Sequence, residues 1–425
     1  MVTIVVLSSD KTLTQKIRKY CAQYDEEFDV IFPVDFSAVT EYLNYEMPEI
    51  CILNGTDQQI DHQSVLTEIK NDPWLHYGGV ILIHGGSLDE RELMKQARDV
   101  NIIALLRRSG LDFFFPRLLR ILNENRSFLF QRDIHALLKS YVSGSFEIHN
   151  DPFDLTTYSN LLANFLFNAN LISADQKEMF HVGMMELLSN AIEHGNCGIS
   201  PEEKSKWLAQ SKELFDLVRE KNKDPQVARK RVHLSYRITP DKSYFNIRDE
   251  GQGFDWRAHN EVIADRGLEE MAGPGIAIAN LYLSGLTYNE QGNRVDFAID
   301  NRQDESNLVP ELFTNMEELV IEDNENIFIQ GEKSSYLYYI VAGKYDIIVN
   351  GKKISTLTPD DIFLGEMSFL LNNRRSATVR SVGKGVLIKI SKEDFINAIK
   401  AKPHYGIFLS RLLAQRLVQL HESTK

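Results

Sequence analysis

The sequence is poor in cysteine, with only Cys21, Cys51 and Cys197 among 425 residues. The three are widely separated and odd in number, so their spacing fits neither a disulfide framework nor a zinc site. This excludes a small disulfide-stabilised scaffold and a zinc-ribbon protein. It favours a protein of the reducing cytoplasm.

Long hydrophobic runs are also missing. No apolar stretch approaches the roughly 20 residues that a membrane-spanning helix needs. The first residues, MVTIVVLSSD, have no basic segment and become polar after Leu7, unlike a secretory signal peptide. We therefore expect a cytoplasmic protein that makes no membrane contact.

An excess of basic charge is the third absence. Lys and Arg total 47 against 60 Asp and Glu, for a formal net charge of −13. Nucleic-acid-binding domains usually carry a basic surface, so direct DNA binding is not expected. Hydrophobic residues make up 43% of the chain, which suffices for several cores. Because domains run to about 100–200 residues, the length predicts two to four of them.

Residues 1–125 alternate short apolar strands with helical patterns. Such alternation predicts a parallel sheet with helices on both faces. A charged helix is expected at about 114–139. Its second half belongs to a helical linker, which is expected at 126–140. The predicted strands are 3–7, 29–32, 49–53, 79–83 and 101–106, and helices are expected at 13–24 and 88–97.

The order of these elements and the stretch PEICILNGTD resemble the receiver domains of two-component signalling, with a flavodoxin-like fold. Receivers place acidic metal ligands after the first strand and a phosphate-accepting Asp after the third. In this sequence Ser8 and Ser9, followed by Asp10, stand at the positions of the metal ligands. Asn54 stands at the position of the phosphate-accepting Asp. An amide is a poor phosphate acceptor, and serines do not supply the charge that holds Mg²⁺. The resemblance implies a receiver-like unit that is not phosphorylated and serves docking or dimerisation; a homodimer is left open.

Residues 141–302 read as an α+β unit, with a helical layer on a mixed sheet. The strand-like GSFEIHN comes first, and a polar helical insert at 200–224 follows two long helices. The helices are predicted at 155–170 and 174–193, and the later strands at 231–238, 244–250 and 294–300.

The stretch MMELLSNAIEHGN places Glu186, Asn190 and His194 four residues apart. Residues at this spacing share one face of an α-helix. A buried carboxylate is unfavourable unless it is paired or bound, so this face meets either water or a ligand. Taken alone, a surface carboxylate and a structural amide would be the more ordinary interpretation.

Two glycine-rich stretches follow. In IRDEGQGFDW a strand ends at Asp249, and Gly251 and Gly253 allow the backbone to approach a ligand closely. In MAGPGIAIANLYLSG, Gly273 and Gly275 precede a helix whose first N–H groups suit phosphate. Each stretch alone is weak, but all three elements in this order predict a nucleotide-binding fold.

The set resembles the GHKL ATP-binding superfamily, and within it the serine kinases of the anti-sigma-factor type. ELLSNAIEHGN is similar to the N-box of that group, and DEGQGFD to its first glycine box. Over residues 145–300 the resemblance implies that ATP and Mg²⁺ bind. Asn190 would be the metal ligand, Glu186 the catalytic general base and Asp249 the acceptor for the adenine amino group. The other ATP-site residues it implies are His194, Gly251, Gly253, Gly273, Gly275 and Thr287.

One departure from the family bears on how fast the phosphate of bound ATP is transferred. Pro274 separates the glycines where relatives often have an Arg nearby, and Arg266 is displaced. A lost phosphate contact would leave ATP bound and transfer slow. Histidine kinases carry a phosphoacceptor on a paired helix, but His135 and His149 lack that setting. Phosphorylation of a Ser or Thr on a protein partner, such as an anti-anti-sigma-type protein, is therefore favoured.

After a linker at 303–311, residues 312–425 show short strands at regular spacing, which predict a small barrel or roll. The Asn350–Gly351 pair between alternating runs predicts a hairpin. An amphipathic helix is expected at 405–422. The chain runs only to Lys425, so no helix-turn-helix is expected after it.

The stretch FLGEMSFLLNNRRSATV resembles the phosphate-binding cassette of cyclic-nucleotide-binding domains, whose fold is a β jelly roll with a C-terminal helix. The resemblance implies that Glu366 binds the ribose 2′-hydroxyl and that Arg375 pairs with the cyclic phosphate, which suits a guanidinium fork. Gly365, Ser376 and Ala377 would complete the site. Versions of this fold that have lost the ligand usually lack the Arg or the Glu; here both are present. The choice between cAMP and cGMP stays open, and Arg374 is expected to face solvent.

Together these features predict a cytoplasmic signalling protein. The leading hypothesis is an ATP-dependent Ser/Thr protein kinase of the anti-sigma-factor type, regulated by a cyclic nucleotide at the C-terminal domain. The alternative is a non-catalytic switch that binds ATP and a cyclic nucleotide and sequesters a regulatory protein. The partner, the oligomeric state and the direction of control are left open.

Overall fold

The computed structural model describes residues 1–33, 43, 48–72, 79–86, 100–126, 142–169, 171–254, 275–301, 306–307, 309–371, 373–407, 409–410 and 413. The helix predicted at 88–97, most of the linker predicted at 126–140, His135 and Gly273 lie outside these residues. Within them, no helix is both long and apolar enough to span a bilayer. Two compact units form, one from residues 1–15, 28–79 and 303–425, the other from 16–27 and 80–302.

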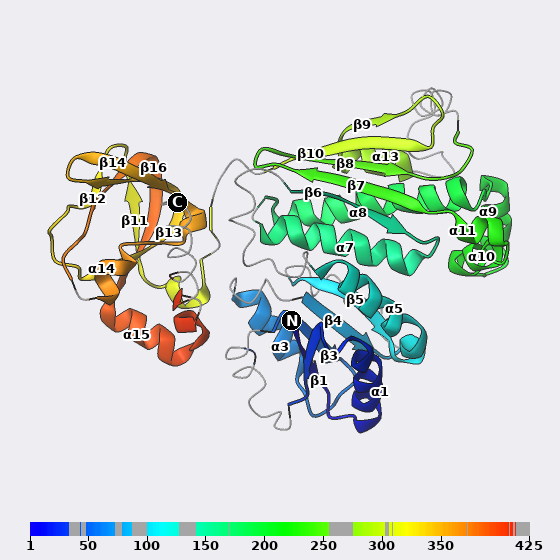
Figure 1. The fold of residues 1–425 in the computed structure, drawn as a ribbon, viewed down its shortest axis with the longest axis horizontal. Coiled ribbons are helices and arrows are strands. Elements are labelled where there is room, and N and C mark those ends of the chain that lie inside the picture. Colours follow the sequence, from blue (N-terminus) through cyan, green and yellow to red (C-terminus); the bar gives the residue numbers. More distant parts are fainter. Residues whose placement is uncertain are drawn as a thin grey trace. The chain divides into compact units, whose positions relative to one another are not determined.

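A five-stranded sheet, ordered β2-β1-β3-β4-β5, is built from the N-terminal strands (Figure 1). β1 pairs in parallel with both β2 and β3, and β4 in parallel with β5. Nearly every residue of β1, β3 and β4 is buried, as in parallel sheets covered on both faces. The predicted parallel sheet is therefore present. Its elements are β1 (Val2–Leu7), α1 (Lys11–Cys21), β2 (Phe28–Ile31), β3 (Ile50–Asn54), α3 (His62–Asn71), β4 (Gly79–His84), β5 (Ile102–Arg107) and α5 (Leu111–Glu124).

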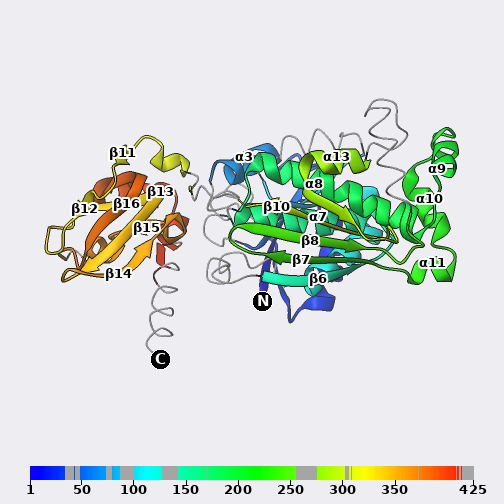
Figure 2. The ribbon, with the colours of Figure 1, turned by 90° about the horizontal axis from the view of Figure 1, so that it is seen from above.

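A second five-stranded sheet has the order β6-β7-β8-β10-β9, and its pairings are antiparallel. The mixed sheet predicted for this segment is wrong in that respect, because β7 and β8 are joined by a tight turn that reverses the chain. The helices lie together on one face of the sheet (Figure 2). The elements are β6 (Val142–Ile148), α7 (Pro152–Asn168), α8 (Ala174–Asn190), β7 (Val232–Ile238), β8 (Lys242–Arg248), α13 (Gly275–Tyr282), β9 (Ser284–Tyr288) and β10 (Arg294–Asp300).

The polar insert forms three short helices where the sequence predicted one. These are α9 (Pro201–Leu208), α10 (Leu214–Lys221) and α11 (Pro225–Arg229). Proline begins α9 and α11 and cannot continue a preceding helix. Ser200 and Asp224 accept hydrogen bonds from the backbone amides at the start of these two helices.

The third sheet is antiparallel, and two 14-residue strands, β13 and β16, run through it. The sequence predicted only short strands in this segment. Gly343 and Gly383, which have positive φ, bend these strands without ending them. The hairpin prediction is confirmed, since Asn350 and Gly351 have φ of 50° and 80°. The strands are β11 (Glu317–Ile321), β12 (Asn326–Phe328), β13 (Tyr336–Val349), β14 (Lys352–Leu357), β15 (Phe363–Leu364) and β16 (Thr378–Ser391).

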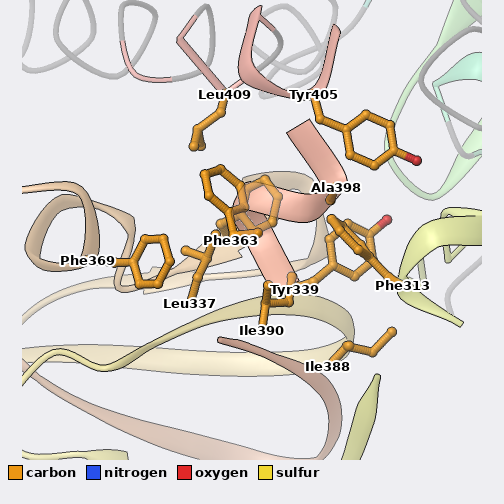
Figure 3. Packing of buried hydrophobic residues seen from close by; sticks show 11 residues of the cluster. Phe313, Leu337, Tyr339, Phe363, Phe369, Ile388, Ile390, Ala398, Tyr405 and Leu409 are labelled. Carbon is orange, nitrogen blue, oxygen red and sulfur yellow. The ribbon is translucent and has the colours of Figure 1, made fainter. Parts of the chain in front are cut away.

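An aromatic core closes this C-terminal domain (Figure 3). The ring centroid of Phe313 lies 5.6 Å from that of Tyr339 and 5.5 Å from that of Tyr405. The sequence did not predict α15 (Lys392–Ala401), which packs Ala398 into the same core. Most of the helix predicted at 405–422 lies outside the described residues, but its first turn, with Tyr405 and Leu409, is part of this core.

Candidate functional site

The loop after β15 has a conformation that requires glycine. Gly365 has φ of +77° and caps α14 (Glu366–Leu370). A Cβ at this position would lie 2.2 Å from Nη1 of Arg375, so any side chain would displace the guanidinium. The sequence signal for this glycine therefore reflects close contact with the Arg375 side chain.

Arg375 is only 4% exposed. Its Nη1 donates to the Gly365 carbonyl at 3.0 Å and to Ser368 Oγ at 3.1 Å, and its Nη2 donates to the Tyr336 carbonyl at 2.5 Å. The guanidinium carbon lies 4.0 Å from the ring centroid of Phe328, within cation–π range. These contacts hold the guanidinium in one orientation inside the domain.

The charge of Arg375 is not neutralised by an ion pair with any residue that the structure describes, and its Nε has no hydrogen-bond partner there. Burial lowers the pKa of Arg375 because the charged form loses solvation. A buried charge is unfavourable unless it is paired. The arrangement suits the binding of an anion at this guanidinium.

The other cassette residues surround this group. Glu366, the first residue of α14, is buried, and its charge acts on Arg375. Ala377 is buried, whereas Ser376 and Arg374 are exposed, as expected for Arg374. Sequence reasoning missed three residues that orient the guanidinium: Phe328 and Tyr336, which come from distant strands and give no local signal, and Ser368, which lies within the quoted stretch.

A second group of predicted residues lies on α8. The helix begins with a capping box between Ser173 and Gln176. Glu186 and Asn190, one turn apart, are both partly buried. Burial raises the pKa of Glu186, Lys204 opposes the rise and Glu193 adds to it. A carboxylate with a raised pKa is a better proton acceptor than an ordinary one.

His194 does not continue this face. The chain widens after Asn190 into a π-helical turn, Ala191–Asn196, in which Cys197 N donates to the Ile192 carbonyl at 2.8 Å. The wider turn breaks the four-residue register, so the single face expected from the sequence ends at Asn190. His194 is exposed, and its Nδ1 lies 2.6 Å from the Ile199 carbonyl, a contact that fits a structural role.

Asp249 follows β8 and is 9% exposed. Its Oδ1 accepts a hydrogen bond from Gly251 N at 2.8 Å, and its own N donates to the Asn293 carbonyl at 3.0 Å. Burial raises the pKa of Asp249 to about 6, and the Gly251 amide and Lys230 limit the rise. A buried carboxylate of this kind favours a ligand that donates a hydrogen bond.

Glycine backbones pack closely around the carboxylate of Asp249. A Cβ at Gly195 would lie 2.4 Å from Cγ of Asp249, and one at Gly251 would lie 2.3 Å from the Gly195 carbonyl. Gly253 has φ of +79° and approaches the Gln291 carbonyl closely. Gly251 and Gly253 approach other backbone groups of the chain closely, and their predicted approach to a ligand stays a prediction. Gly195 was missed, although the His–Gly pair in the quoted stretch was a usable signal.

The structure describes some of the remaining predicted residues but not all of them. Gly275 is the first residue of α13, and Gly273 lies outside the described residues. Thr287 on β9 is exposed. Neighbouring Tyr288 is partly buried instead, and burial and the charge of Asp249 raise its pKa. Because successive strand residues point to opposite faces, Tyr288 rather than Thr287 is the β9 neighbour of Asp249.

The described residues of this segment offer few ligands for Mg²⁺ bound with ATP. In the part of the chain that the structure describes, no cluster of three or more His, Cys, Asp or Glu residues could hold a metal ion. Mg²⁺ bound with nucleotide phosphates usually needs few protein ligands, so the amide oxygen of Asn190 is a suitable one. The buried carboxylate of Asp249 suits a base that donates a hydrogen bond from an exocyclic amino group.

The receiver-like position in the N-terminal sheet is occupied by internal hydrogen bonds. Asn54 Nδ2 donates to Ser8 Oγ at 2.9 Å. Asp57, which the sequence reasoning missed, accepts from the Ser9 backbone N at 2.5 Å and from Ser9 Oγ at 2.8 Å. Asp10 accepts from the first amides of α1 and so caps that helix. These side chains satisfy one another's hydrogen-bonding groups, and the absence of phosphorylation stays a prediction.

Comparison with known proteins places a cyclic nucleotide-binding domain at residues 318–402. A cGMP-dependent protein kinase of Plasmodium berghei is 36% identical over 85 residues, which are 20% of this chain and 10% of that protein. A Pycsar effector protein of Xanthomonas perforans is 35% identical over 91 residues, 21% of this chain and 30% of that protein. The cyclic AMP receptor protein of Thermus thermophilus is 33% identical over 96 residues, 21% of this chain and 44% of that protein.

These matches cover less than half the length of each relative. The family model matches the segment that contains Gly365, Glu366 and Arg375. The chain therefore contains a C-terminal cyclic-nucleotide-binding domain, and its cassette lies within the matched residues.

Proposed function

We propose that the protein is a cyclic-nucleotide-responsive, ATP-dependent protein kinase that acts on a Ser or Thr of a protein partner. The observation that carries the cyclic-nucleotide part is the buried Arg375 guanidinium, whose Nε has no hydrogen-bond partner among the described residues. A cyclic phosphate would supply the missing negative charge, and Glu366 would accept a hydrogen bond from the ribose 2′-hydroxyl. Relatives named for cGMP and for cAMP both match, so either nucleotide fits this proposal.

The kinase part of the proposal is supported by three side chains of the middle segment. Asp249 would accept a hydrogen bond from the adenine amino group, and Asn190 would hold Mg²⁺ through its amide oxygen. Mg²⁺, when bound with ATP, supplies positive charge that offsets the charge developing on the phosphates. Glu186, with its raised pKa, would accept the proton of the partner's hydroxyl. The new bond joins that oxygen to the γ-phosphorus, the bond from phosphorus to the β–γ bridging oxygen breaks, and ADP leaves.

Transfer of label tests this function. Full-length protein, γ-labelled ATP, Mg²⁺ and an anti-anti-sigma-type protein are incubated together, with and without cAMP or cGMP. We expect label on the partner in an acid-stable form, at a rate that a cyclic nucleotide changes. Glu186→Gln should abolish transfer and keep ATP binding. Glu178→Gln, an exposed carboxylate on the same helix, is the matched control and should transfer normally.

A non-catalytic switch is the second candidate. Pro274 between the glycines, with Arg266 displaced, favours it because a phosphate contact would be lost. In that case ATP binds, no label moves, and Glu186→Gln changes nothing. Acid-labile label on the protein itself would instead indicate histidine autophosphorylation. Of the two histidines considered for that role, His149 has its Nδ1 3.5 Å from the buried carboxylate of Asp154.

A further inference from the structure

Asn196 ends the π-helical turn and is 1% exposed. Its side-chain amide is used in both directions: Oδ1 accepts from Glu250 N at 2.8 Å, and Nδ2 donates to Asn150 Oδ1 at 2.8 Å. Its backbone carbonyl accepts from Lys230 Nζ at 3.1 Å. A buried amide with both ends satisfied has one orientation only.

The bond to Glu250 N reaches the base site directly, because that nitrogen belongs to the peptide that joins Asp249 to Glu250. Asn196 thereby holds this peptide, and Gly251 N then donates to the carboxylate of Asp249. The carboxylate also lies against Gly195, the residue before Asn196. The direction of the Asp249 carboxylate thus depends on the amide of Asn196.

Asn150 is held in turn by the insert. Its Nδ2 donates to the Val227 carbonyl at 2.8 Å, and its own carbonyl accepts from Asn222 Nδ2 at 2.7 Å. Because the nitrogen of Asn150 is engaged there, its oxygen faces Asn196. Two segments far apart in the sequence therefore support one hydrogen bond at the base site.

We propose that Asn196, held by Asn150, is a positioning residue that makes the site selective for adenine by fixing the carboxylate of Asp249. This inference rests on the ATP binding proposed above. A site built to accept a hydrogen bond from a ligand rejects an analogue without the donor, because a buried acceptor is then left unpaired. The discrimination requires the acceptor to point at the donor, since hydrogen bonds weaken steeply with angle and distance.

Inosine triphosphate is the informative probe, because its base presents a carbonyl oxygen where adenine presents an amino group. Dissociation constants for Mg–ATP and Mg–ITP are measured on the full chain by calorimetry. We expect the wild type to prefer ATP by at least about tenfold, consistent with a lost buried hydrogen bond. Asn196→Ala should bring the ratio close to one, chiefly by weakening ATP. Asn150→Ala should move the ratio in the same direction by a smaller factor.

Asn301→Ala is the matched control. Asn301 is also a buried amide with two hydrogen bonds, to Thr239 and Ser243, but it lies near the opposite end of β8 from Asp249. Its substitution should leave the ATP-to-ITP ratio at the wild-type value. Equal weakening of both nucleotides by Asn196→Ala would show a merely structural role and overturn the inference.

The remaining outcomes separate this inference from the proposed function. If the Asn196→Ala variant does not fold, the Asn150→Ala variant provides the test. An ATP-to-ITP ratio equal to that of the wild type in this variant overturns the positioning role. If the wild type binds ATP and ITP equally, the proposed ATP binding is retained. The proposed role of Asp249 and this inference are then both overturned. A wild type that binds neither nucleotide overturns the proposed ATP function and the inference together.

Discussion

The cassette of the C-terminal domain and the base site of the middle segment bury charges of opposite sign. Arg375 is a buried cation with a lowered pKa, and Asp249 is a buried anion with a raised pKa. Neither forms an ion pair with a residue in the described ranges. Burial disfavours the charged form in both cases, so each site gains when a ligand supplies the missing partner. In the function proposed above, Arg375 would recognise the phosphate of one nucleotide and Asp249 the base of another.

The largest expected effect is at the cation. Arg375→Ala should weaken binding of cAMP and cGMP by at least about 30-fold, because loss of one partner of a buried charge pair costs roughly 2–5 kcal/mol. ATP affinity should stay at the wild-type value. Calorimetry with each nucleotide measures both.

Arg374→Ala is the control for this substitution, since Arg374 is the exposed neighbour whose Nη1 donates to the Gly331 carbonyl. It should bind cyclic nucleotides like the wild type. Equal losses in the two variants would mean that the burial of Arg375 has no bearing on the ligand.

Substitution of Asp249 should have a smaller effect, which is unfavourable for ATP binding and favourable for stability. Asp249→Asn should weaken ATP about tenfold or more, since the amide is a weaker acceptor. The same change should stabilise the ligand-free protein. The folded-state pKa of about 6 exceeds the ordinary 3.8, so the ionised carboxylate opposes folding increasingly as pH rises from about 4 to 6, and fully above. Removing the charge should add on the order of 2 kcal/mol at neutral pH.

Denaturant unfolding and nucleotide titration of this variant test both statements. Asp300→Asn, an exposed acid on β10, is the control and should change neither ATP affinity nor stability in this direction. A destabilised Asp249→Asn protein would show that the carboxylate is satisfied by its surroundings, and the contrast with Arg375 would then fail.

The smallest effect is a difference in pH dependence between the sites. With a pKa of about 6, Asp249 is mostly ionised at pH 7.5 and mostly protonated at pH 5. ATP affinity should therefore fall about tenfold over this interval as the acceptor is lost. Arginine stays charged throughout, so cyclic-nucleotide affinity should change little. The Asp249→Asn variant separates protonation of ATP itself from that of Asp249, and a parallel decline at both sites would contradict the prediction.

The two sites also differ in how far the sequence predicted them. The cassette residues lie between Gly365 and Ala377 in one continuous stretch, so their types and spacing could be recognised together. The base site draws on α8, the turn after β8 and strand β9. Asn196 and Tyr288 were missed there because their partners lie tens of residues away.

A similar limit applies to the N-terminal sheet. The strands were predicted closely because continuous apolar runs are typical of a parallel sheet. Asn54 was also visible in the sequence, as a polar residue at the end of an apolar run. The role of Asp57 was not, because its contact with Ser9 forms only when β1 and β3 lie side by side.

The sequence by itself determined the order of strands and helices, the Asn350–Gly351 hairpin and the glycines that permit close backbone approach. These features follow from hydrophobic periodicity and from the conformations that single residues allow, both of which are local. Only the tertiary structure decided that Arg375 and Asp249 are buried with no ion pair to another residue that the structure describes. It also decided that a π-helical turn removes His194 from the face of Glu186, and that Asn150 holds Asn196. Burial and hydrogen-bond partners depend on segments that meet only when the chain folds, so no local pattern encodes them.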